Sequence, residues 1–423
     1  MTKEGKGTAT IRRRKLKHRH GDMDKAKTNA QNLTEEDDHH EVDEEEEGYL
    51  FDEEVLGTSI VQKIMASEKT ILLGLIAFRV TNALLIQTQF VPDEYWQSLE
   101  VAHNMVFGYG YMTWEWREGL RGYLYPSLIA LLYKILAIFH LDYRILLVSV
   151  YQGYFQGVLA AYGDLYLFKL SCKLTDRATA QWTLLCQTLS WFMIYCSTRT
   201  LTNSTETVLI TVALSSTSKF LLFVSLSVLI RPTAAVMWIL MCSWHLQQSK
   251  QNMILMKTLK QYVFVGLSSF VVSLLLDCGF YGDWIFVQYN FLKFNFLQGG
   301  GSFYGTHPWH WYITQGFPVI MGTHLFPFVM GVWKARNKAL VFLIVWMIFI
   351  YSFLSHKEFR FIMPVLPLSM HYCGVYFQTL SKKPRLKKKK IKASDTKNYE
   401  QETSLSNSSS SQSLESSIDS TET

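Results

Sequence analysis

Charge and hydrophobicity are sorted along this chain of 423 residues. Charged residues concentrate at its two ends, while the middle is apolar and aromatic. Apolar segments of about 20 residues are long enough to cross the hydrocarbon core of a bilayer, and charges are costly within them. The pattern therefore predicts an all-α polytopic membrane protein with polar tails. The net charge of +6 is a poor guide to partners, because basic clusters in such a chain set membrane orientation, and no nucleic-acid partner is expected.

About ten segments are predicted membrane spans, by their length and apolar content. Residues 71–90 form the first, and Arg79 and Asn82 within it predict that one of its sides faces protein rather than lipid. Arg231 and Pro232 interrupt a later apolar run, where the missing proline N–H predicts a helix break. The other segments run approximately over residues 123–139, 145–168, 180–197, 206–230, 232–246, 262–277, 317–332, 340–354 and 359–380.

The chain divides by composition into a basic and then acidic tail, a multi-span region, and a basic and serine-rich tail, at residues 1–57, 58–380 and 381–423. Such tails bury too little apolar surface to fold, so both are predicted to be disordered. Their basic clusters are expected in the cytosol, which requires an even number of spans and places the long loops 91–122 and 279–316 on the opposite side. A basic turn at 169–177 conflicts with simple alternation, so one segment is re-entrant or one crossing is unrecognised.

Cofactor and metal motifs are missing from the sequence. The six cysteines form no CxxC pair and are interpreted as small apolar residues of helices. The pair of histidines in HPWH, residues 307–310, lacks further ligands, so no metal site is predicted. No phosphate-binding G-x-x-x-x-G-K-[ST] loop and no dinucleotide fingerprint occur. An enzyme of this sequence is therefore expected to use no cofactor and to draw an activated donor from the bilayer.

Adjacent carboxylates, Asp93 and Glu94, stand at the start of the first long loop, directly after Pro92. Neighbouring side chains of a helix point about 100° apart, so the two need not share a target. We expect one to act as a general base and the other to orient a ligand. The alternative is the first turn of a helix, where acidic residues beside a proline complement the helix dipole.

A second cluster of ionisable groups is SHKEFRF, residues 355–361, in which His356 and Lys357 share helix faces with Arg360. Charges are expensive at mid-bilayer, so the cluster belongs in a polar cavity or at the interface. In a cavity it would suit a phosphate, which arginine grips with two hydrogen bonds. The alternative is a short basic loop between spans.

Further polar groups lie within or beside apolar segments and indicate either a functional cavity or helix pairing: Asp164, Arg199, Asn203, Glu206, Arg231 and Asp277. The second long loop contains FLQGGGSFYGTHPWHWY, residues 296–312. Its glycines allow close backbone approach to a ligand. Its aromatic residues suit a sugar platform or a membrane-interface belt.

Three of these motifs together resemble one enzyme family. VPDEYWQSLEVAH at 91–103, TRTLTNSTET at 198–207 and SHKEFRF at 355–361 are similar to the lipid-donor mannosyltransferases of the endoplasmic reticulum, glycosyltransferase family 22. PDE after the first span and HKE-x-RF between late spans are the signatures of that family. Within it, PDEYWQSLE, YGYMTWEW, IRPTA, NFLKFN and FYGTHPWHWY resemble the branch that adds the third mannose to the glycosylphosphatidylinositol (GPI) precursor.

The resemblance implies a GT-C fold, a multi-pass endoplasmic reticulum protein, and α-1,2 transfer from dolichyl-phosphate-mannose to a glycolipid acceptor on the lumenal side. It implies that Asp93 is the base and that Glu94 supports it. Four residues are expected at the donor phosphate: Arg199, His356, Lys357 and Arg360. Others in the same motifs are expected to contact substrate: Trp96, Gln97, Asn203, Glu206, His307, Trp309 and His310.

Other readings stay open at this point. The chain could act on the dolichol-linked oligosaccharide, as another member of the same family. Members of the family usually continue past the HKE-x-RF helix with more spans, whereas a basic tail follows Leu380 here. A truncated, inactive relative is therefore a second alternative. A transporter would require inverted repeats, and the sequence contains none that can be recognised.

Overall fold

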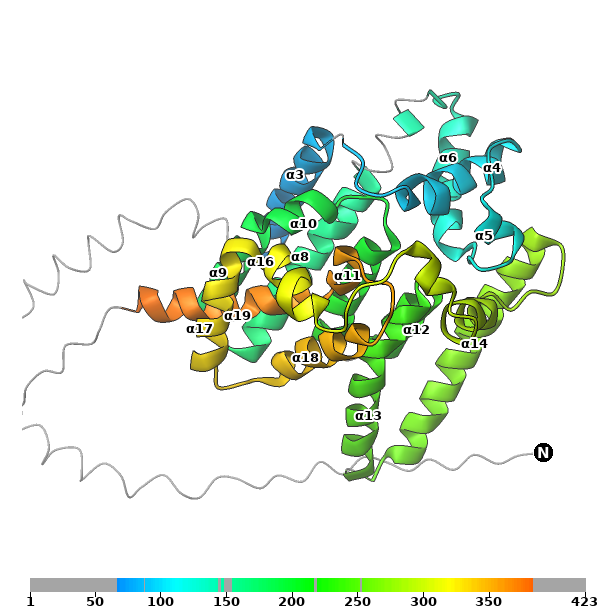
Figure 1. The fold of residues 1–423 in the computed structure, drawn as a ribbon. Helices are drawn as coiled ribbons and strands as arrows, with labels where there is room; N and C mark the ends of the chain where they lie inside the picture. The colour runs from blue at the N-terminus through cyan, green and yellow to red at the C-terminus, as the bar shows by residue number, and fades with distance from the viewer. Residues whose placement is uncertain are drawn as a thin grey trace, which may run out of the picture. The chain divides into compact units, whose positions relative to one another are not determined.

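In the computed structural model of the chain, all regular secondary structure among the described residues is helical (Figure 1). It describes residues 67–86, 88–143, 146–147, 154–216, 219–251 and 253–382. No strand occurs among these residues, which confirms the predicted all-α class. The predicted disordered tails fall outside the described residues, except for 381 and 382. The chain divides into two compact units, Met1–Gly74 and Leu75–Thr423. Of the first unit, only the start of helix α3 is described, and all other described residues belong to the second.

Every predicted span is mainly helical where it is described. Continuous helices cover most of them: α3 (Glu68–Leu85), α6 (Leu124–Ile138), α8 (Gly157–Leu174), α13 (Ala235–Gln251), α14 (Leu255–Tyr281), α18 (Ala339–Ser352) and α19 (Val365–Ser381). Three predicted spans are instead divided. Segment 180–197 holds α9 (Arg177–Leu189) and α10 (Trp191–Cys196). Segment 206–230 holds α11 (Thr202–Ser215) and α12 (Phe220–Ile230), and 317–332 holds α16 (Phe317–Met321), η7 (Gly322–His324) and α17 (Leu325–Lys334).

Short helices also occupy both predicted loops. Loop 91–122 contains η1 (Tyr95–Leu99), α4 (Glu100–Phe107) and α5 (Trp114–Arg117). Loop 279–316 contains α15 (Val287–Leu292), η4 (Lys293–Leu297), η5 (Gly300–Tyr304) and η6 (Tyr312–Gly316). Both predicted loops therefore contain regular helical structure.

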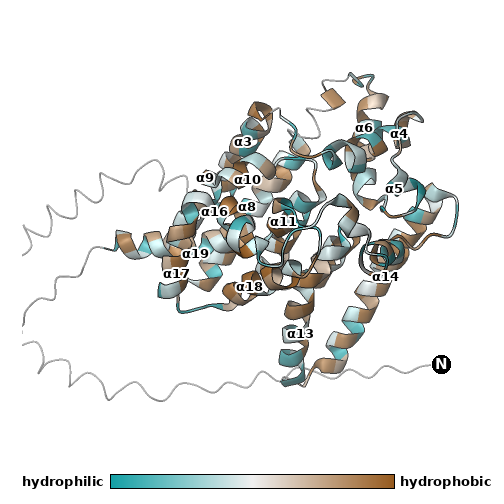
Figure 2. Cartoon of the chain, in the orientation of Figure 1, coloured by the Kyte–Doolittle hydropathy of each residue, from teal (hydrophilic) through white to brown (hydrophobic). Residues whose placement is uncertain are grey.

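Among the described residues, two helical stretches are long and apolar enough to cross a bilayer by length and composition, Leu255–Tyr281 and Tyr312–Lys334. Three shorter helices, α6, α12 and α18, are also apolar, and Figure 2 shows most of α18 as hydrophobic. Large apolar side chains of α14, including Phe264 and Leu267, are exposed. Exposed apolar surface of this kind fits a lipid environment. The total of ten spans stays a prediction.

Helix α19 contributes many residues to the largest hydrophobic core of the described residues and is buried from Val365 to Val375. It packs against α9 and α17. At Gly374 an added Cβ would lie 2.2 Å from Thr183 Oγ1, and at Gly331 it would lie 1.8 Å from the Tyr372 carbonyl oxygen. Glycine is needed at both positions because the helix backbones touch.

The break between α12 and α13 occurs at Arg231 and Pro232, as the sequence predicts. Arg231 adopts an extended backbone (φ −145°) and Pro232 begins the short helix η3 (Pro232–Ala234). Because proline has no N–H to donate, the α-helix cannot continue through it. Arg231 therefore lies between the two helices and within neither of them.

A buried ion pair joins α3 to α8. Arg79 Nε lies 2.6 Å from Asp164 Oδ2, and the two side chains are 0% and 2% exposed. Gln187 Nε2 of α9 donates to the other carboxylate oxygen at 3.0 Å, and Arg79 also donates to Ser197 Oγ at 2.9 Å. The polar residues predicted to face protein in the first span therefore fix helix packing.

Replacing Asp164 with leucine should destabilise the fold by about 3 to 5 kcal/mol, because it leaves the Arg79 charge buried without its partner. The free energy of unfolding of the detergent-solubilised protein measures this. Asp283→Leu, at an exposed position, is the control and should change stability by no more than about 0.5 kcal/mol. The double variant Arg79→Leu, Asp164→Leu should recover most of the loss, and a double variant as unstable as the single one would contradict the pairing.

Candidate active site

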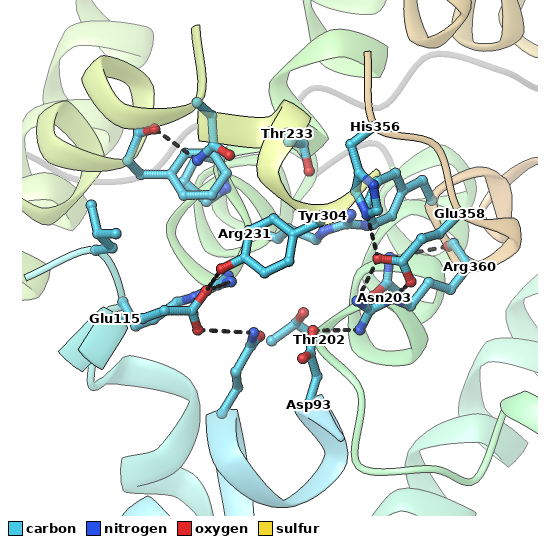
Figure 3. A pocket seen from close by; sticks show the side chains of 18 of the residues that line it. Asp93, Glu115, Thr202, Asn203, Arg231, Thr233, Tyr304, His356, Glu358 and Arg360 are labelled. Carbon is cyan, nitrogen blue, oxygen red and sulfur yellow. Dashed lines mark hydrogen bonds and ion pairs between the residues drawn. The ribbon is translucent and has the colours of Figure 1, made fainter. Parts of the chain in front are cut away.

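A cavity of about 740 Å³ lies where several helices end. Its volume is in the range of small-molecule binding sites, about 300 to 1,000 Å³. Its lining comes from residues 91–97, from residues 115–126 up to the start of α6, from the start of α11, the α12–α13 break, the stretch from α15 to η5, and residues 351–361 (Figure 3). The candidate site therefore brings together motifs that are far apart in the sequence.

Asp93 lines this cavity and is 28% exposed. It follows Pro92 in the turn that leads into η1. Its Oδ2 lies 2.6 Å from Arg360 Nη1. Within the part of the chain that the structure describes, no hydrogen bond reaches Oδ1. Asp93 therefore keeps one carboxylate oxygen for a ligand.

Glu94 has a different environment from its neighbour. It is 1% exposed, and it is not among the residues that line the cavity. Its Oε1 accepts hydrogen bonds from the backbone N–H groups of Phe90 (2.8 Å) and Val91 (3.2 Å), and Arg199 Nη1 lies 3.1 Å from Oε2. This matches the alternative of a carboxylate that stabilises the first helical turn. Glu94 thus shapes the loop that carries Asp93.

Arg199 is also held away from the cavity. Its guanidinium donates to Glu94 and to the backbone carbonyls of Thr88 and Tyr195, and its side chain is 5% exposed. Lys357 is 3% exposed and donates to the carbonyls of His307 (2.9 Å) and Leu354. Of the four residues predicted at a donor phosphate, His356 and Arg360 line the cavity. Arg199 and Lys357 do not line it.

Glu358 organises the HKE-x-RF motif, although the sequence analysis did not single it out. Arg360 donates to it through Nε (2.5 Å) and Nη2 (2.9 Å). His356 Nε2 lies 2.9 Å from Glu358 Oε1, and its Nδ1 lies 3.1 Å from the Gly305 carbonyl oxygen. Both ring nitrogens thus face acceptors, which requires a doubly protonated imidazolium.

The ionisation of this cluster follows from the same contacts. Burial opposes the charge of Glu358, but hydrogen bonds from His356 and Arg360 lower its pKa to about 2. The hydrogen bond to Glu358 raises the pKa of His356 above its ordinary 6.5, against the effect of burial. Arg360 contacts both carboxylates, Glu358 and Asp93. Glu358 is therefore ionised at neutral pH, and its hydrogen bond with His356 favours the imidazolium form.

Arg231 reaches the cavity from the α12–α13 break. Its Nη1 lies 2.7 Å from Oε2 of Glu206, which is fully buried, and its guanidinium lies 5.0 Å from the centroid of the Phe361 ring. The structure describes no other hydrogen bond from this side chain. Glu206 was predicted to contact substrate, whereas here it holds Arg231, which lines the cavity in its place.

A second polar cluster lines the cavity from loop 91–122. Arg121 donates to Glu115 through Nη2 (2.8 Å) and Nε (3.2 Å), Gln97 Nε2 donates at 3.4 Å, and the Tyr304 hydroxyl donates at 3.2 Å. Of these residues the sequence analysis predicted Gln97 as a substrate contact and placed Tyr304 in the aromatic loop that suits a sugar platform or a membrane-interface belt, whereas Glu115 and Arg121 were not predicted. Tyr304 lies 189 positions from Glu115, so sequence proximity gave no signal of their contact.

Of the other residues predicted to contact substrate, some line the cavity and others lie outside its lining. Asn203 lines the cavity and donates to the Arg360 carbonyl oxygen at 3.0 Å. Trp96 is 39% exposed, and Trp309 and His310 are exposed, all outside the cavity lining. His307 stacks on Trp311 with ring centroids 4.7 Å apart. Among the described residues no group of three His, Cys, Asp or Glu side chains could hold a metal ion.

Replacing Glu358 with glutamine should lower the pKa of His356, because the hydrogen bond to that carboxylate is the largest cause of its increase. Histidine resonances of the ¹³C-labelled, solubilised protein, followed against pH, measure this. The exposed His310 is the control, and His356→Gln assigns the signal. An unchanged midpoint for His356 would contradict the role of Glu358.

The pH dependence has a defined sign. Because the pKa of His356 is raised in the folded state, its ion pair stabilises the protein fully below the ordinary value of 6.5 and is lost as the pH rises through the folded value. Wild-type protein should lose this stability on alkaline titration, while Glu358→Gln should not show that loss.

Comparison with known proteins shows which proteins the chain is related to. The sequence model of the Alg9-like mannosyltransferase family matches residues 70–398. GPI alpha-1,2-mannosyltransferase 3 of Xenopus laevis is 48% identical over 324 residues, which are 74% of this chain and 60% of that protein. The human protein of the same name is 47% identical over 330 residues, 75% of this chain and 59% of that protein. GPI mannosyltransferase 3 of Drosophila melanogaster is 41% identical over 315 residues, 71% and 55% of the two.

The chain spans about 60% of the length of the first two of these relatives. No solved structure matches it significantly. The resemblance inferred from the PDE and HKE-x-RF motifs is confirmed, because the family match covers well over half of the chain and includes both motifs. This chain belongs to the Alg9-like mannosyltransferase family.

Proposed function

We propose that this chain is a multi-pass mannosyltransferase of the endoplasmic reticulum membrane. It transfers mannose in α-1,2 linkage from dolichyl-phosphate-mannose to the GPI precursor and adds the third mannose. One observation carries the proposal: Asp93, which is held by Arg360, lines the same cavity as Arg231. The names of the relatives, which specify GPI and α-1,2 transfer, support this choice over the dolichol-linked oligosaccharide.

Asp93 is the general base of this proposal. Its Oδ1 accepts the proton of the acceptor hydroxyl while the hydroxyl oxygen forms a bond to the anomeric carbon of the donor mannose. The bond from that carbon to the phosphate oxygen breaks, and dolichyl phosphate leaves with the electron pair. Attack opposite the leaving group inverts the anomeric configuration. Arg360 fixes the carboxylate by its 2.6 Å contact to Oδ2, which orients Oδ1 for proton transfer.

Arg231 is the proposed ligand of the donor phosphate. The other cations of the cavity are engaged: Arg360 with Asp93 and Glu358, Arg121 with both oxygens of Glu115, and His356 with Glu358. Arg231 has one carboxylate contact, to a residue behind the wall. Its other N–H groups suit a phosphate, whose charge grows as the sugar leaves, and a fixed cation there stabilises the transition state.

The proposed membrane topology has cytosolic tails, a lumenal cavity and about ten spans. The turn between α8 and α9 supports it. Burial opposes ionisation of Asp176 in that turn, but hydrogen bonds from Thr179 and the charge of Lys382 lower its pKa. The basic turn at 169–177 therefore lies near the end of α19, which leads into the C-terminal basic cluster. This favours the cytosolic side for both, and it requires that one segment before residue 169 is re-entrant or that one crossing is unrecognised.

Complementation tests the activity and the base together. The chain is expressed in cells that cannot add the third mannose, and surface display of GPI-anchored proteins is scored with the accumulating glycolipid. Wild type and the control Asp283→Asn, at an exposed position, should restore display. Asp93→Asn should abolish transfer at normal expression, because the amide cannot accept the proton. Near-normal rescue by Asp93→Asn would assign the base elsewhere, and failure of well-expressed wild type would reject the proposed step.

Replacing Arg231 with glutamine should raise the KM for dolichyl-phosphate-mannose about ten- to hundredfold, since a charged hydrogen bond to the phosphate is lost. Initial rates in microsomes, with donor concentration varied at saturating acceptor, measure the change. Arg336→Gln, an exposed arginine outside the cavity lining, should leave this KM unchanged. An unaltered donor KM in Arg231→Gln would place the phosphate elsewhere.

A further inference from the structure

The polar cluster of Gln97, Glu115, Arg121 and Tyr304 has no part in the proposed base or phosphate contact. Its members come from η1, α5, the turn after α5, and η5, and all line the cavity. Glu115 is the centre, with Arg121 and Tyr304 bound to Oε1 and with Arg121 and Gln97 bound to Oε2. Figure 3 shows Tyr304 between Glu115 on one side and His356 on the other.

The charge of this cluster is balanced within it. The Glu115 carboxylate faces the Arg121 guanidinium in a two-bond pair, and the two side chains are 13% and 30% exposed. A phosphate would meet the Glu115 charge here, whereas at Arg231 it would meet a cation whose carboxylate is buried behind the wall. The cluster is therefore suited to a neutral ligand with hydroxyl groups rather than to an anion.

The hydrogen-bonding groups that remain match a sugar. Each Glu115 oxygen already accepts two bonds, so Glu115 acts by holding its partners in place. Arg121 Nη1 carries two N–H donors, the Gln97 side-chain carbonyl is an acceptor, and the Tyr304 hydroxyl, which donates to Glu115, retains lone pairs. Donors and acceptors fixed in one place, in a cavity that the apolar Trp116 and Phe291 also line, are typical of a polar site that orients a ligand.

Tyr304 connects this cluster to the reacting groups. Its hydroxyl lies 3.2 Å from Glu115, and its ring centroid lies 5.8 Å from that of His356. Burial, then Glu115, and to a smaller extent Asp93 raise the pKa of Tyr304 to about 12, so the hydroxyl stays protonated. Gly299 and Gly305, with φ of +65° and +101°, bound the η5 segment that carries it. The cluster and Asp93 line the same cavity.

We propose that Gln97, Arg121 and Tyr304, positioned by Glu115, form the subsite for the acceptor sugar. This inference rests on the proposed function and deepens it, since it divides the cavity into a donor-phosphate side at Arg231 and an acceptor side at Glu115. Glu115 is a positioning residue, and the other three contact the sugar. The ligand class is a neutral hexopyranose at the non-reducing end of the glycolipid acceptor.

Two conservative substitutions test the subsite. Glu115→Gln removes the charge that holds Arg121, and Tyr304→Phe removes one hydroxyl. Each should raise the KM for the acceptor glycolipid about tenfold, with the donor KM unchanged within about twofold. The matched controls are Glu118→Gln and Tyr289→Phe, which are exposed and lie outside the lining, and both should leave the acceptor KM unchanged. Unchanged acceptor KM in both test variants would overturn the proposal, and a raised donor KM alone would make the cluster part of the donor site.

Direct binding separates this inference from the transfer reaction. Methyl α-mannopyranoside should raise the thermal unfolding temperature of the purified wild type and of Asp93→Asn. It should not do so in Tyr304→Phe, which removes too little to prevent folding. Stabilisation in wild type and Asp93→Asn without transfer would reject the proposed activity and keep the subsite. Equal stabilisation of Tyr304→Phe, or none in wild type, would reject the subsite.

Discussion

The Arg360 guanidinium joins two carboxylates that the sequence places 265 positions apart, Asp93 and Glu358. These two contacts connect the loop after α3 with the loop before α19 at the cavity lining. Glu358 in turn fixes His356, whose second nitrogen faces the carbonyl of Gly305. Asn203 at the start of α11 binds the Arg360 backbone. The position of the proposed base, of the imidazolium and of the glycine-rich segment therefore depends on this arginine.

Ion pairs also join the helices and loops around the cavity. Arg79 with Asp164, Arg199 with Glu94, and Arg231 with Glu206 each join an arginine to a carboxylate with little solvent contact. An unpaired charge in such surroundings is costly, so each pair restricts how the segments can pack. In the first two pairs both members lie outside the lining of the large cavity. In the third, the buried acid turns the arginine toward the cavity, so the same interaction serves both packing and ligand binding.

The cavity lies where helices are interrupted. The α12–α13 break at Pro232, the start of α11 and the turn before α19 all contribute to its lining. In a membrane protein, irregular backbone is tolerated where it is buried in protein or lines a cavity. The apolar faces of α14 and α18 need no such breaks. The breaks that line the cavity are thus distinct from those between α9 and α10 and within residues 317–332, which lie outside the lining.

The sequence by itself determined the helical class, the break at Pro232, the family, and the two motifs that meet in the cavity. These follow from local rules, because hydropathy, a missing N–H and short signatures are readable within a few residues. Only the tertiary structure decided which charges line the cavity. Asp93 reaches it and the adjacent Glu94 does not, since neighbouring side chains diverge and packing selects the face. Arg231 rather than Arg199 has donors left for a ligand, and Glu115 meets Tyr304 across 189 positions, because partners so distant are set by folding and not by spacing.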